Sequence, residues 1–523
     1  MKSDIIYNKN KMFLPIFSAI LGILAFFPFN FSYIFGFVFL APLFIFIFQE
    51  KKFWRLILGI FIFKIILSTV TLYFAFEPYG FLLSIFVFLG LPVSVFAIRN
   101  GLASLNNNPR LSASIKNIIR VYPLLFLLPF LWIFFENLQA GYSFLPVYLG
   151  TVGNIFGNSP FLGLAAVAGL NTLSFFAVLI NILIALAIFN FKKLSYKSNF
   201  AVIVIVIIIV AAGWQISQIK LQQNSNFYGN RPNALKVGLI SNNEKFDEEF
   251  LIFKSDIFTD EEKELASLMI DEKLNLLRAD LRDKKLDLLI LPEDMIDIEV
   301  WNDADKEAQE KFGISNAGIL IKAYRNLAKE LNTYLVATLT TIQDNKRYNS
   351  TLLFNSEGEL VDIYSKSHLT IGGEYWPFDN WRPFYYDWLK KIMPKLDTEN
   401  AIFNPAYQYT PGNKKLLKNE NLSFASLICI EVHYPYEVKA FKNLGAQFIS
   451  HTSSNRWIAI GLKNYLYLTD NLRKIEAVWL RIPILINGRY EKAGIITPAG
   501  KINVIDFESP SKNYGLFTGE IKY

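Results

Sequence analysis

The chain has 523 residues, of which 52% are apolar and 16% aromatic, and its formal net charge is +7. That length and apolar content exclude a single soluble domain, because the apolar residues are concentrated in the first 220 positions. Those positions hold fifteen Lys or Arg against four Asp or Glu, so the rest of the chain is slightly acidic. The positive charge belongs to loops between apolar segments, and it gives no support to nucleic-acid binding.

Apolar segments follow one another through the first part of the chain, and most have about the 20 residues that a bilayer core requires. Lys64 lies within the third of them, where a charge is costly and often functional. The alternative is that its side chain snorkels to the cytoplasmic face or faces the bundle interior. Glu136 ends the fifth and is expected at the interface. The sequence predicts seven membrane spans, at residues 13–29, 32–48, 56–76, 81–98, 121–137, 160–189 and 200–217.

The basic residues fall on one side of these spans. The loops after spans two, four and six carry Lys and Arg, whereas the loops after spans one, three and five carry neither. The positive-inside rule places the basic loops and the amino terminus in the cytoplasm. Seven crossings then export the remainder, so residues 1–220 are predicted to form a transmembrane helical bundle and residues 221–523 an extracytoplasmic domain.

The second half alternates short apolar strands with amphipathic helices, which is typical of an α/β domain. Strands are predicted at 235–240, 286–291, 333–340, 422–430 and 446–452, with a hairpin at 352–361 that turns at 356–358. Helices are predicted at 260–283, 314–331 and 465–480.

Three of these strands lead directly into one ionisable residue each: Glu293, Lys366 and Cys429. A lone cysteine in an apolar strand is usually a small core residue, and a single lysine is usually a surface charge. Together, however, a thiol, a carboxylate and an ammonium group supply what thiol-based acyl transfer needs. The thiolate attacks an acyl carbon, the carboxylate moves protons, and the ammonium stabilises the oxyanion.

The segments around these residues resemble the carbon–nitrogen hydrolase (nitrilase) superfamily. With the preceding apolar segments, they more narrowly resemble the apolipoprotein N-acyltransferases. The resemblance is carried by Leu291-Pro-Glu293, Tyr364-Ser-Lys366-Ser-His-Leu369, Gly373-Glu374-Tyr-Trp-Pro377 and Ile428-Cys429-Ile-Glu431.

This resemblance implies a four-layer α-β-β-α sandwich in the second half of the chain. It also implies that Cys429 is the nucleophile, Glu293 the general base and then acid, and Lys366 the third catalytic residue. Glu374 and Glu431 are expected to orient the lysine or to stabilise the intermediate, although both could be ordinary loop carboxylates. No cofactor is implied.

An aromatic segment follows Glu374 and is interpreted as a substrate arm that contacts lipid, with a hydrophobic cluster inside the domain as the alternative. Its predicted members are Tyr375, Trp376, Trp381 and Trp388. No zinc-type spacing of Cys and His and no glycine-rich nucleotide loop occurs in the sequence, so neither a metal nor a nucleotide is expected. The single cysteine allows no internal disulfide.

The family reaction implied by the resemblance is N-acylation of apolipoproteins in the bacterial cytoplasmic membrane. A phospholipid acylates the cysteine, and the α-amino group of a diacylglyceryl-modified apolipoprotein then takes the acyl chain. The sequence departs from the family pattern at Leu291, Ile430 and Ser454-Asn-Arg-Trp457, and residues 515–523 do not resemble the family's final span. Two alternatives stay open: a membrane-tethered amidase or acyltransferase with another amine substrate, and a catalytically decayed binding module.

Overall fold

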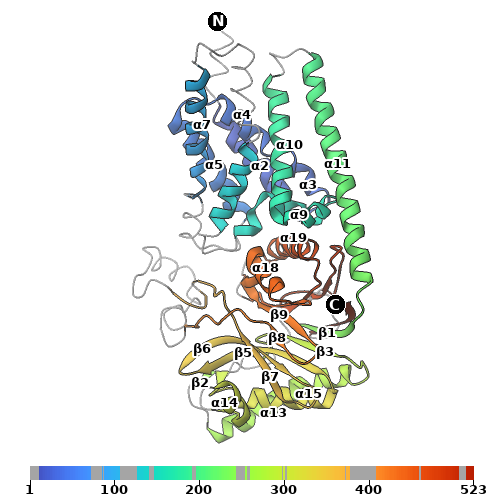
Figure 1. The fold of residues 1–523 in the computed structure, drawn as a ribbon. Helices are drawn as coiled ribbons and strands as arrows, with labels where there is room; N and C mark the ends of the chain where they lie inside the picture. The colour runs from blue at the N-terminus through green and yellow to red at the C-terminus, as the bar shows by residue number, and fades with distance from the viewer. Residues whose placement is uncertain are drawn as a thin grey trace. The chain divides into compact units, whose positions relative to one another are not determined.

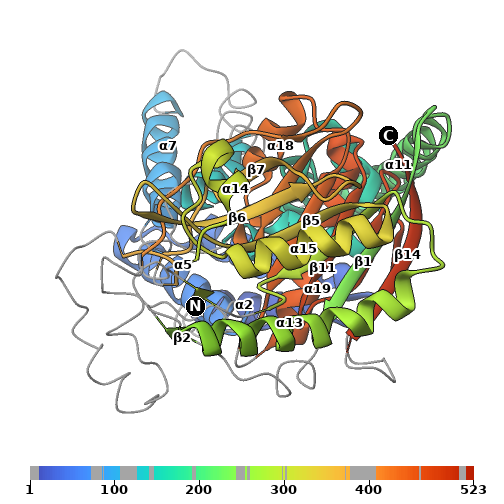
Figure 2. The ribbon, with the colours of Figure 1, turned by 90° about the horizontal axis from the view of Figure 1, so that it is seen from below.

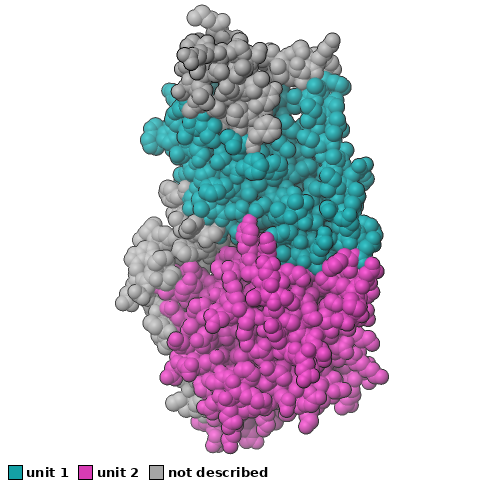
Figure 3. Space-filling model, viewed as in Figure 1, with its two compact units in different colours: residues 1–226, 458–481, 498–500 teal, residues 227–457, 482–497, 501–523 magenta. Residues whose placement is uncertain are grey.

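A computed structural model describes residues 11–71, 85, 87–106, 127–140, 147–190, 196–242, 254–255, 259–296, 299–300, 303–371, 373–376, 408–456, 458, 461–505 and 514–523. The chain divides into two compact units (Figure 3). Unit 1 comprises Met1–Asn226, Ile458–Arg481 and Pro498–Gly500, and unit 2 comprises Phe227–Trp457, Ile482–Thr497 and Lys501–Tyr523. Two late segments therefore group with the apolar first part of the chain.

Unit 1 is helical (Figure 1). Glycines allow its elements to pack closely, because a Cβ added at Gly157 would lie 2.4 Å from the backbone oxygen of Asn471. Its α-helices are α2 (Phe13–Phe26), α3 (Ser32–Gly36), α4 (Ala41–Gln49), α5 (Phe53–Thr71), α7 (Gly90–Asn106), α9 (Ala165–Ala168), α10 (Leu170–Asn190), α11 (Tyr196–Gly229) and α19 (Leu462–Leu480), and a further apolar helix spans Leu127–Ala140. Its 3₁₀ helices are η2 (Val147–Gly150), η3 (Val152–Asn158) and η4 (Leu162–Leu164).

Among the described residues, four helical segments are long and apolar enough to cross a membrane: Ser32–Gln49, Phe53–Thr71, Leu170–Ile188 and Phe200–Gly229. The helices at Phe13–Phe26 and Leu127–Ala140 are apolar but shorter, and part of the predicted span at 81–98 lies outside the described residues. The described residues therefore show four long spans out of the seven predicted. The predicted span at 160–189 was too long, because η4, α9 and Gly169, whose φ is +61°, precede the start of α10.

The two charged residues in the apolar segments are both buried. Lys64 is 6% exposed, and its ammonium lies 4.3 Å from the centre of the Phe88 ring, so it faces the bundle interior. Glu136 is also 6% exposed, and its two oxygens accept hydrogen bonds from the Val152 N–H and the Ser174 hydroxyl, each at 2.8 Å. The expectation that Glu136 lies at the interface was wrong, because these donors satisfy the carboxylate inside the unit.

Unit 2 is built on one mixed sheet, whose described strands have the order β7-β6-β5-β3-β1-β11-β10-β9-β8, with β12, β13 and β14 joined to it through β11 and β1. Its strands are β1 (Ala234–Asn242), β3 (Leu288–Glu293), β5 (Tyr334–Gln343), β6 (Lys346–Phe354), β7 (Leu360–Ser365), β8 (Leu417–Lys418), β9 (Ser423–Ile428), β10 (Ile449–Ser454), β11 (Ile484–Arg489), β12 (Ala493–Ile496), β13 (Ile502–Ile505) and β14 (Tyr514–Lys522). Two short strands, β2 (Lys254–Ser255) and β4 (Glu299–Val300), pair separately.

The sheet folds against itself, because side chains from distant strands meet. The Ser426 hydroxyl on β9 donates to the Thr351 hydroxyl on β6 at 3.1 Å, although five strands separate β9 from β6 in the sheet order. Helices α13 (Asp260–Leu281) and α15 (Gly318–Leu331) cover the outer face of the half that contains β1, β3, β5 and β6 (Figure 2). The shared apolar core lies between these helices and strands. It includes Leu274, Leu277, Leu289, Ile321, Leu335 and Phe354, each at most 1% exposed.

The helix–strand alternation predicted from the sequence is confirmed for the described residues, and the fold is α/β with an apolar helical part. Helix α15 begins at Gly318 and not at residue 314, because Ala317 adopts a left-handed conformation with φ +60°. Unit 2 also contains the short helices α14 (Lys306–Phe312) and α18 (Pro435–Asn443). Strands β11 to β14 were not predicted.

Candidate active site

Three strand ends in unit 2 carry the residues that the sequence predicts for catalysis. Glu293 is the last residue of β3, Lys366 directly follows β7, and Cys429 directly follows β9. Pro292 cannot donate a backbone hydrogen bond, and the pairing of β3 with β5 shifts register between Ile290 and Glu293. All three side chains are buried, at 5%, 1% and 7% exposure respectively, and charge interactions link them.

Cys429 lies at a sharp turn between a strand and a helical segment. Its φ is +52°, in the left-handed region that a residue with a side chain rarely adopts, and the 3₁₀ helix η6 (Cys429–His433) begins there. The carbonyl oxygen of Cys429 lies 2.8 Å from Nε2 of the buried His451. A strained turn of this kind presents a nucleophile at the end of a strand, next to the backbone N–H groups of the following helix.

The Glu293 carboxylate is held from two sides. Its Oε1 accepts a hydrogen bond from Asn349 Nδ2 at 2.9 Å, and its Oε2 accepts one from the Ser454 backbone N–H at 2.7 Å. Burial raises the pKa of Glu293, whereas the positive charge of Lys366 and these two donors oppose that rise. A carboxylate whose pKa lies above its usual range can both accept and return a proton.

Lys366 is paired with Glu374. The Lys366 ammonium donates to Glu374 Oε2 at 2.7 Å, and that oxygen also accepts from the Thr370 backbone N–H at 2.7 Å. Burial opposes the positive charge, but the negative charge of Glu374, its hydrogen bond to the ammonium and the charge of Glu293 outweigh burial and raise the pKa of Lys366. Lys366 therefore carries a fixed positive charge at neutral pH, and the same pairing lowers the pKa of Glu374 despite its burial.

The thiol of Cys429 is protonated at rest. Burial is the main cause that raises its pKa to about 12, while Lys366 and the backbone N–H of Ile430 favour the thiolate and Glu293 opposes it. A thiol in this state needs a base to take its proton as it attacks. The Glu293 carboxylate and the Lys366 ammonium are both close enough for their charges to act on the thiol.

Glu431 was expected to orient Lys366 or to stabilise the intermediate. Its oxygens do not bond to the Lys366 ammonium; instead they tie the segment after Lys366 to the turn at Cys429. Glu431 Oε1 accepts from the Tyr364 hydroxyl at 2.6 Å, the Ser367 N–H at 2.9 Å, the Ser367 hydroxyl at 2.9 Å and the His368 N–H at 3.1 Å, and Oε2 accepts from the Ile428 N–H at 2.9 Å. We infer that Glu431 fixes the lysine loop to the cysteine turn.

Asn349 is a site residue that the sequence did not reveal. Its Nδ2 donates both to Glu293 Oε1 at 2.9 Å and to Glu374 Oε1 at 3.0 Å, so it joins the two carboxylates. The sequence carries no signal for it, because Asn349 lies inside β6, where its carbonyl oxygen accepts from the Lys366 N–H at 2.8 Å. An amide whose N–H₂ group faces two carboxylates can take only this orientation.

The predicted substrate arm is described only in part. Tyr375 is half-buried and Trp376 is 8% exposed, while Trp381 and Trp388 lie outside the described residues. The burial of Trp376 agrees with an aromatic cluster inside the domain at that position. Within the described ranges, no group of three or more His, Cys, Asp or Glu side chains could hold a metal ion.

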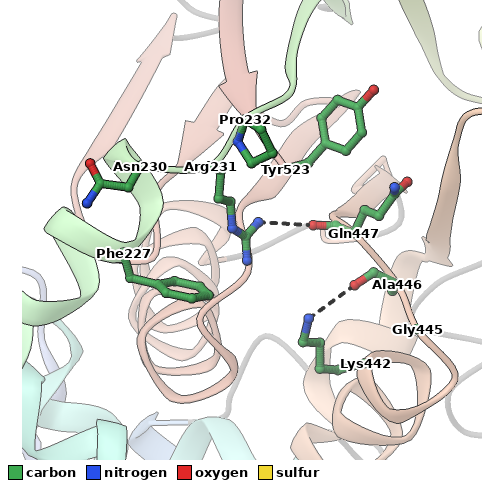
Figure 4. Close-up of a pocket in the computed structure, with 9 residues that line it drawn as sticks. All are labelled: Phe227, Asn230, Arg231, Pro232, Lys442, Gly445, Ala446, Gln447 and Tyr523. Atoms are coloured by element: carbon green, nitrogen blue, oxygen red, sulfur yellow. Dashed lines mark hydrogen bonds between the residues drawn. The ribbon is translucent and has the colours of Figure 1, made fainter.

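A separate pocket of about 520 Å³ lies in unit 2 at the start of β1, and none of its lining residues belongs to the candidate site (Figure 4). Its two cations are each bonded to a backbone carbonyl: Arg231 Nη1 to the Gln447 oxygen at 3.4 Å and Lys442 Nζ to the Ala446 oxygen at 3.3 Å. The candidate catalytic residues are therefore a distinct cluster.

Comparisons with known proteins match both parts of the chain. Residues 18–183 match the family model "Apolipoprotein N-acyltransferase N-terminal domain", and residues 263–477 match the model "Carbon-nitrogen hydrolase". A protein of Aquifex aeolicus named apolipoprotein N-acyltransferase is 26% identical over 249 residues, which are 47% of this chain and 48% of that one. A Treponema denticola protein named apolipoprotein N-acyltransferase 2 is 24% identical over 209 residues, which are 39% and 38%. The chain thus spans less than half the length of these relatives.

Solved structures align with about half of the chain. The yeast protein Nit3 of the nitrilase superfamily has 16% identity and a TM-score of 0.36, and covers 56% of this chain and 91% of its own. A Helicobacter pylori carbon–nitrogen hydrolase has 13% identity and a TM-score of 0.35, covering 55% and 89%.

Proposed function

Because the chain belongs to the apolipoprotein N-acyltransferase family and carries a carbon–nitrogen hydrolase domain, we propose that it is a membrane N-acyltransferase. The proposed acyl donor is a phospholipid, and the proposed acceptor is the α-amino group of a diacylglyceryl-modified apolipoprotein. We further propose that it lies in the bacterial cytoplasmic membrane, with its amino terminus in the cytoplasm and unit 2 outside. The basic loops after alternate spans support that orientation.

In the first half-reaction, the Cys429 sulfur attacks the ester carbonyl of the phospholipid while Glu293 takes the thiol proton. The carbonyl oxygen becomes an oxyanion, which the Lys366 ammonium and the backbone N–H of Ile430 can stabilise. The C–O bond then breaks, Glu293 returns the proton to the leaving oxygen, and a lysophospholipid departs. An acyl thioester remains on Cys429.

In the second half-reaction, the neutral α-amine of the acceptor attacks the thioester carbonyl and forms a second oxyanion at the same place. Glu293 takes a proton from the attacking nitrogen, the C–S bond breaks, and the Cys429 sulfur recovers the proton. The amide product leaves and the site returns to its starting state, so atoms and charges balance over the cycle.

One observation carries this proposal: a buried, hydrogen-bonded chain runs from Glu293 through Asn349 and Glu374 to Lys366, and its charges act on a single thiol at a strained turn. Burying these charges is costly unless each is paired, and a merely structural core would avoid them. The arrangement therefore favours catalysis over a decayed binding module.

The departures at Leu291 and Ile430, which flank Glu293 and Cys429, leave room for a different acceptor. An amidase would use the same thioester but would pass the acyl group to water. The residues in the site do not differ between these two outcomes, so the acceptor decides between them.

The test is a transfer assay with purified protein, a phospholipid labelled in its acyl chain and a synthetic diacylglyceryl lipopeptide with a free α-amine. We expect label in the lipopeptide, lost in Cys429→Ala, Glu293→Gln and Lys366→Met. The exposed residues Glu359 and Lys415 provide matched controls, Glu359→Gln and Lys415→Met, which should retain transfer. Transfer that persists in Cys429→Ala would overturn the proposal, and release of free fatty acid without transfer would favour the amidase alternative.

A further inference from the structure

Two pockets on unit 1 lie next to each other, because Tyr33 and Pro160 line both of them. One has a volume of about 490 Å³ and is largely apolar, and the other has a volume of about 390 Å³ and is more polar. Together they form one amphipathic surface feature, which we call the α11 groove. It shares no residue with the candidate active site.

The apolar part of the α11 groove follows one stripe of helix α11. Val206, Ile207, Val210, Ala211 and Trp214 line it, and their spacing places them on one face of the helix. Ile207 is 61% exposed and Trp214 is 48% exposed, although both lie in a segment apolar enough to span a membrane. Side chains of this kind suit contact with a hydrocarbon chain.

The polar part of the α11 groove contains a positive charge. The Lys474 ammonium on α19 donates to Asn158 Oδ1 at 3.2 Å, and Asn30 and Ser159 also line the pocket. The described residues that line this pocket include no Asp or Glu. Its chemistry therefore suits an anionic group that carries several hydrogen-bond acceptors, such as a phosphate.

The spacing of the two parts matches the layers of a bilayer. Trp214 lines the apolar part and Leu221 lines the polar part, and these residues are seven positions apart on α11, which is about 10 Å along a helix axis. The headgroup layer on one side of a bilayer is about 5–8 Å thick. Tyr33 lines both parts, at the boundary where aromatic side chains with a polar end are favoured.

We propose that the α11 groove binds one glycerophospholipid, with an acyl chain along α11 and the phosphate at Lys474. The occupant is a phospholipid because the apolar stripe adjoins a pocket lined by a cation and hydrogen-bond donors, which match its two chemical parts. This inference requires only that unit 1 lies in a membrane. It does not depend on the proposed acyl transfer.

The test measures lipid binding to the delipidated full-length protein in detergent by native mass spectrometry, with phosphatidylglycerol as the probe. We expect one tightly held lipid in the wild type. Lys474→Gln should weaken binding about tenfold, the effect of one charge-assisted hydrogen bond. Val210→Trp should abolish binding by filling the groove. Diacylglycerol, which lacks the phosphate, should bind about as weakly to the wild type as phosphatidylglycerol binds to Lys474→Gln.

Two matched controls separate this groove from general contact with lipid. Ile208 is 59% exposed on α11 and does not line the groove, so Ile208→Trp should leave binding unchanged. Lys463→Gln removes an exposed charge from the same helix as Lys474 and should also leave it unchanged. Each variant is checked for folding by size-exclusion chromatography.

A photoreactive acyl chain on the same lipid locates the bound molecule. Crosslinks concentrated at residues 206–214 support the proposal. Equal labelling along the whole of α11, unchanged affinity in Lys474→Gln, or a dimer of the protein whose interface is broken by Val210→Trp would each overturn it.

Discussion

At the residue scale, the resting state of Cys429 constrains how the site can work. Burial raises its pKa to about 12, so the thiolate is scarce at neutral pH and the nucleophile must be generated during the reaction. Glu293 raises that pKa further by its negative charge, whereas Lys366 lowers it. The same carboxylate therefore disfavours the free thiolate and supplies the base that the reaction needs.

Because Glu293 has these two effects, the variant Glu293→Gln should change thiol alkylation and acyl transfer in opposite directions. Loss of the negative charge lowers the pKa of Cys429, so alkylation of this single thiol by iodoacetamide at pH 9 should become severalfold faster. Acyl transfer should nevertheless be lost, because the base is gone. Lys366→Met should slow both reactions, and Lys366→Arg should restore the alkylation rate. Slower alkylation in Glu293→Gln would contradict the assigned charges.

Asn349 provides a second prediction at this scale. Its N–H₂ group lowers the pKa of Glu293, so Asn349→Ala should raise that pKa and move the acidic limb of the kcat/KM profile to higher pH. Loss of a hydrogen bond to a buried carboxylate costs about 1.5–3 kcal/mol, which corresponds to about a tenfold to hundredfold fall in kcat/KM.

The matched control for Asn349 is Asn421→Ala, because Asn421 is exposed and lies outside the site. Its profile should coincide with that of the wild type. An acidic limb that stays in place in Asn349→Ala, with only the maximum lowered, would show that Asn349 acts on the fold and not on Glu293.

Individual site residues differ in how far the sequence could reveal them. The positions of Glu293, Lys366 and Cys429 at the ends of apolar strands could be predicted, and strand ends are where sites form. Asn349 could not, because it lies inside a strand and acts only through the fold that brings β3 and the loop after β7 to it. Glu431 joins the segment after Lys366 to the turn at Cys429 through tertiary contacts, so this role could not be predicted from the sequence either.

At the scale of elements, the turn between β9 and η6 stores strain that can be measured. A left-handed conformation costs a residue with a Cβ about 1–2 kcal/mol, and glycine avoids this cost. We compare two variants without the thiol. The free energy of unfolding of Cys429→Gly should be about 1 kcal/mol higher than that of Cys429→Ala, so Cys429→Gly should unfold at a higher denaturant concentration.

The control for this turn is Ala425→Gly, made in the Cys429→Ala background. Ala425 is fully buried within β9, where glycine should destabilise by about 0.5–1 kcal/mol or more. If Cys429→Gly were as unstable as that control, the left-handed turn would not be the strained element described here.

Elements were easiest to predict where their pattern was local. The strands at 235–240 and 286–291 and the helix at 260–283 have clear apolar periodicity and occur as predicted. Strands β11 to β14 were missed. The four-residue strands β12 and β13 are placed by their partners in the sheet and not by a pattern of their own. The long span at 160–189 failed because Gly169 and the 3₁₀ turn interrupt a continuously apolar run.

At the scale of the whole molecule, the chain combines a helical unit with an α/β unit that carries the site. Late residues 458–481 and 498–500 belong to the first unit, which a division by sequence position could not have revealed. The apolar composition of the first 220 residues did indicate a membrane protein, although the described helices support four long spans and not seven.

The orientation of the molecule can be tested with single cysteines, because Cys429→Ser leaves the chain without any. We expect a membrane-impermeant maleimide to label Lys284→Cys in cells whose outer layers are permeable, since Lys284 is exposed in unit 2. Lys52→Cys, in a basic loop predicted to be cytoplasmic, should react only after the membrane is broken. The reverse pattern would invert the proposed topology.

The most direct test of the whole account is the mass of the peptide that contains Cys429 after the protein meets a phospholipid without any acceptor. We predict that this peptide gains the mass of one acyl chain and that hydroxylamine, which cleaves thioesters, removes it. Turnover of the phospholipid with an unmodified Cys429 peptide, or an acyl group found on another residue, would contradict the account.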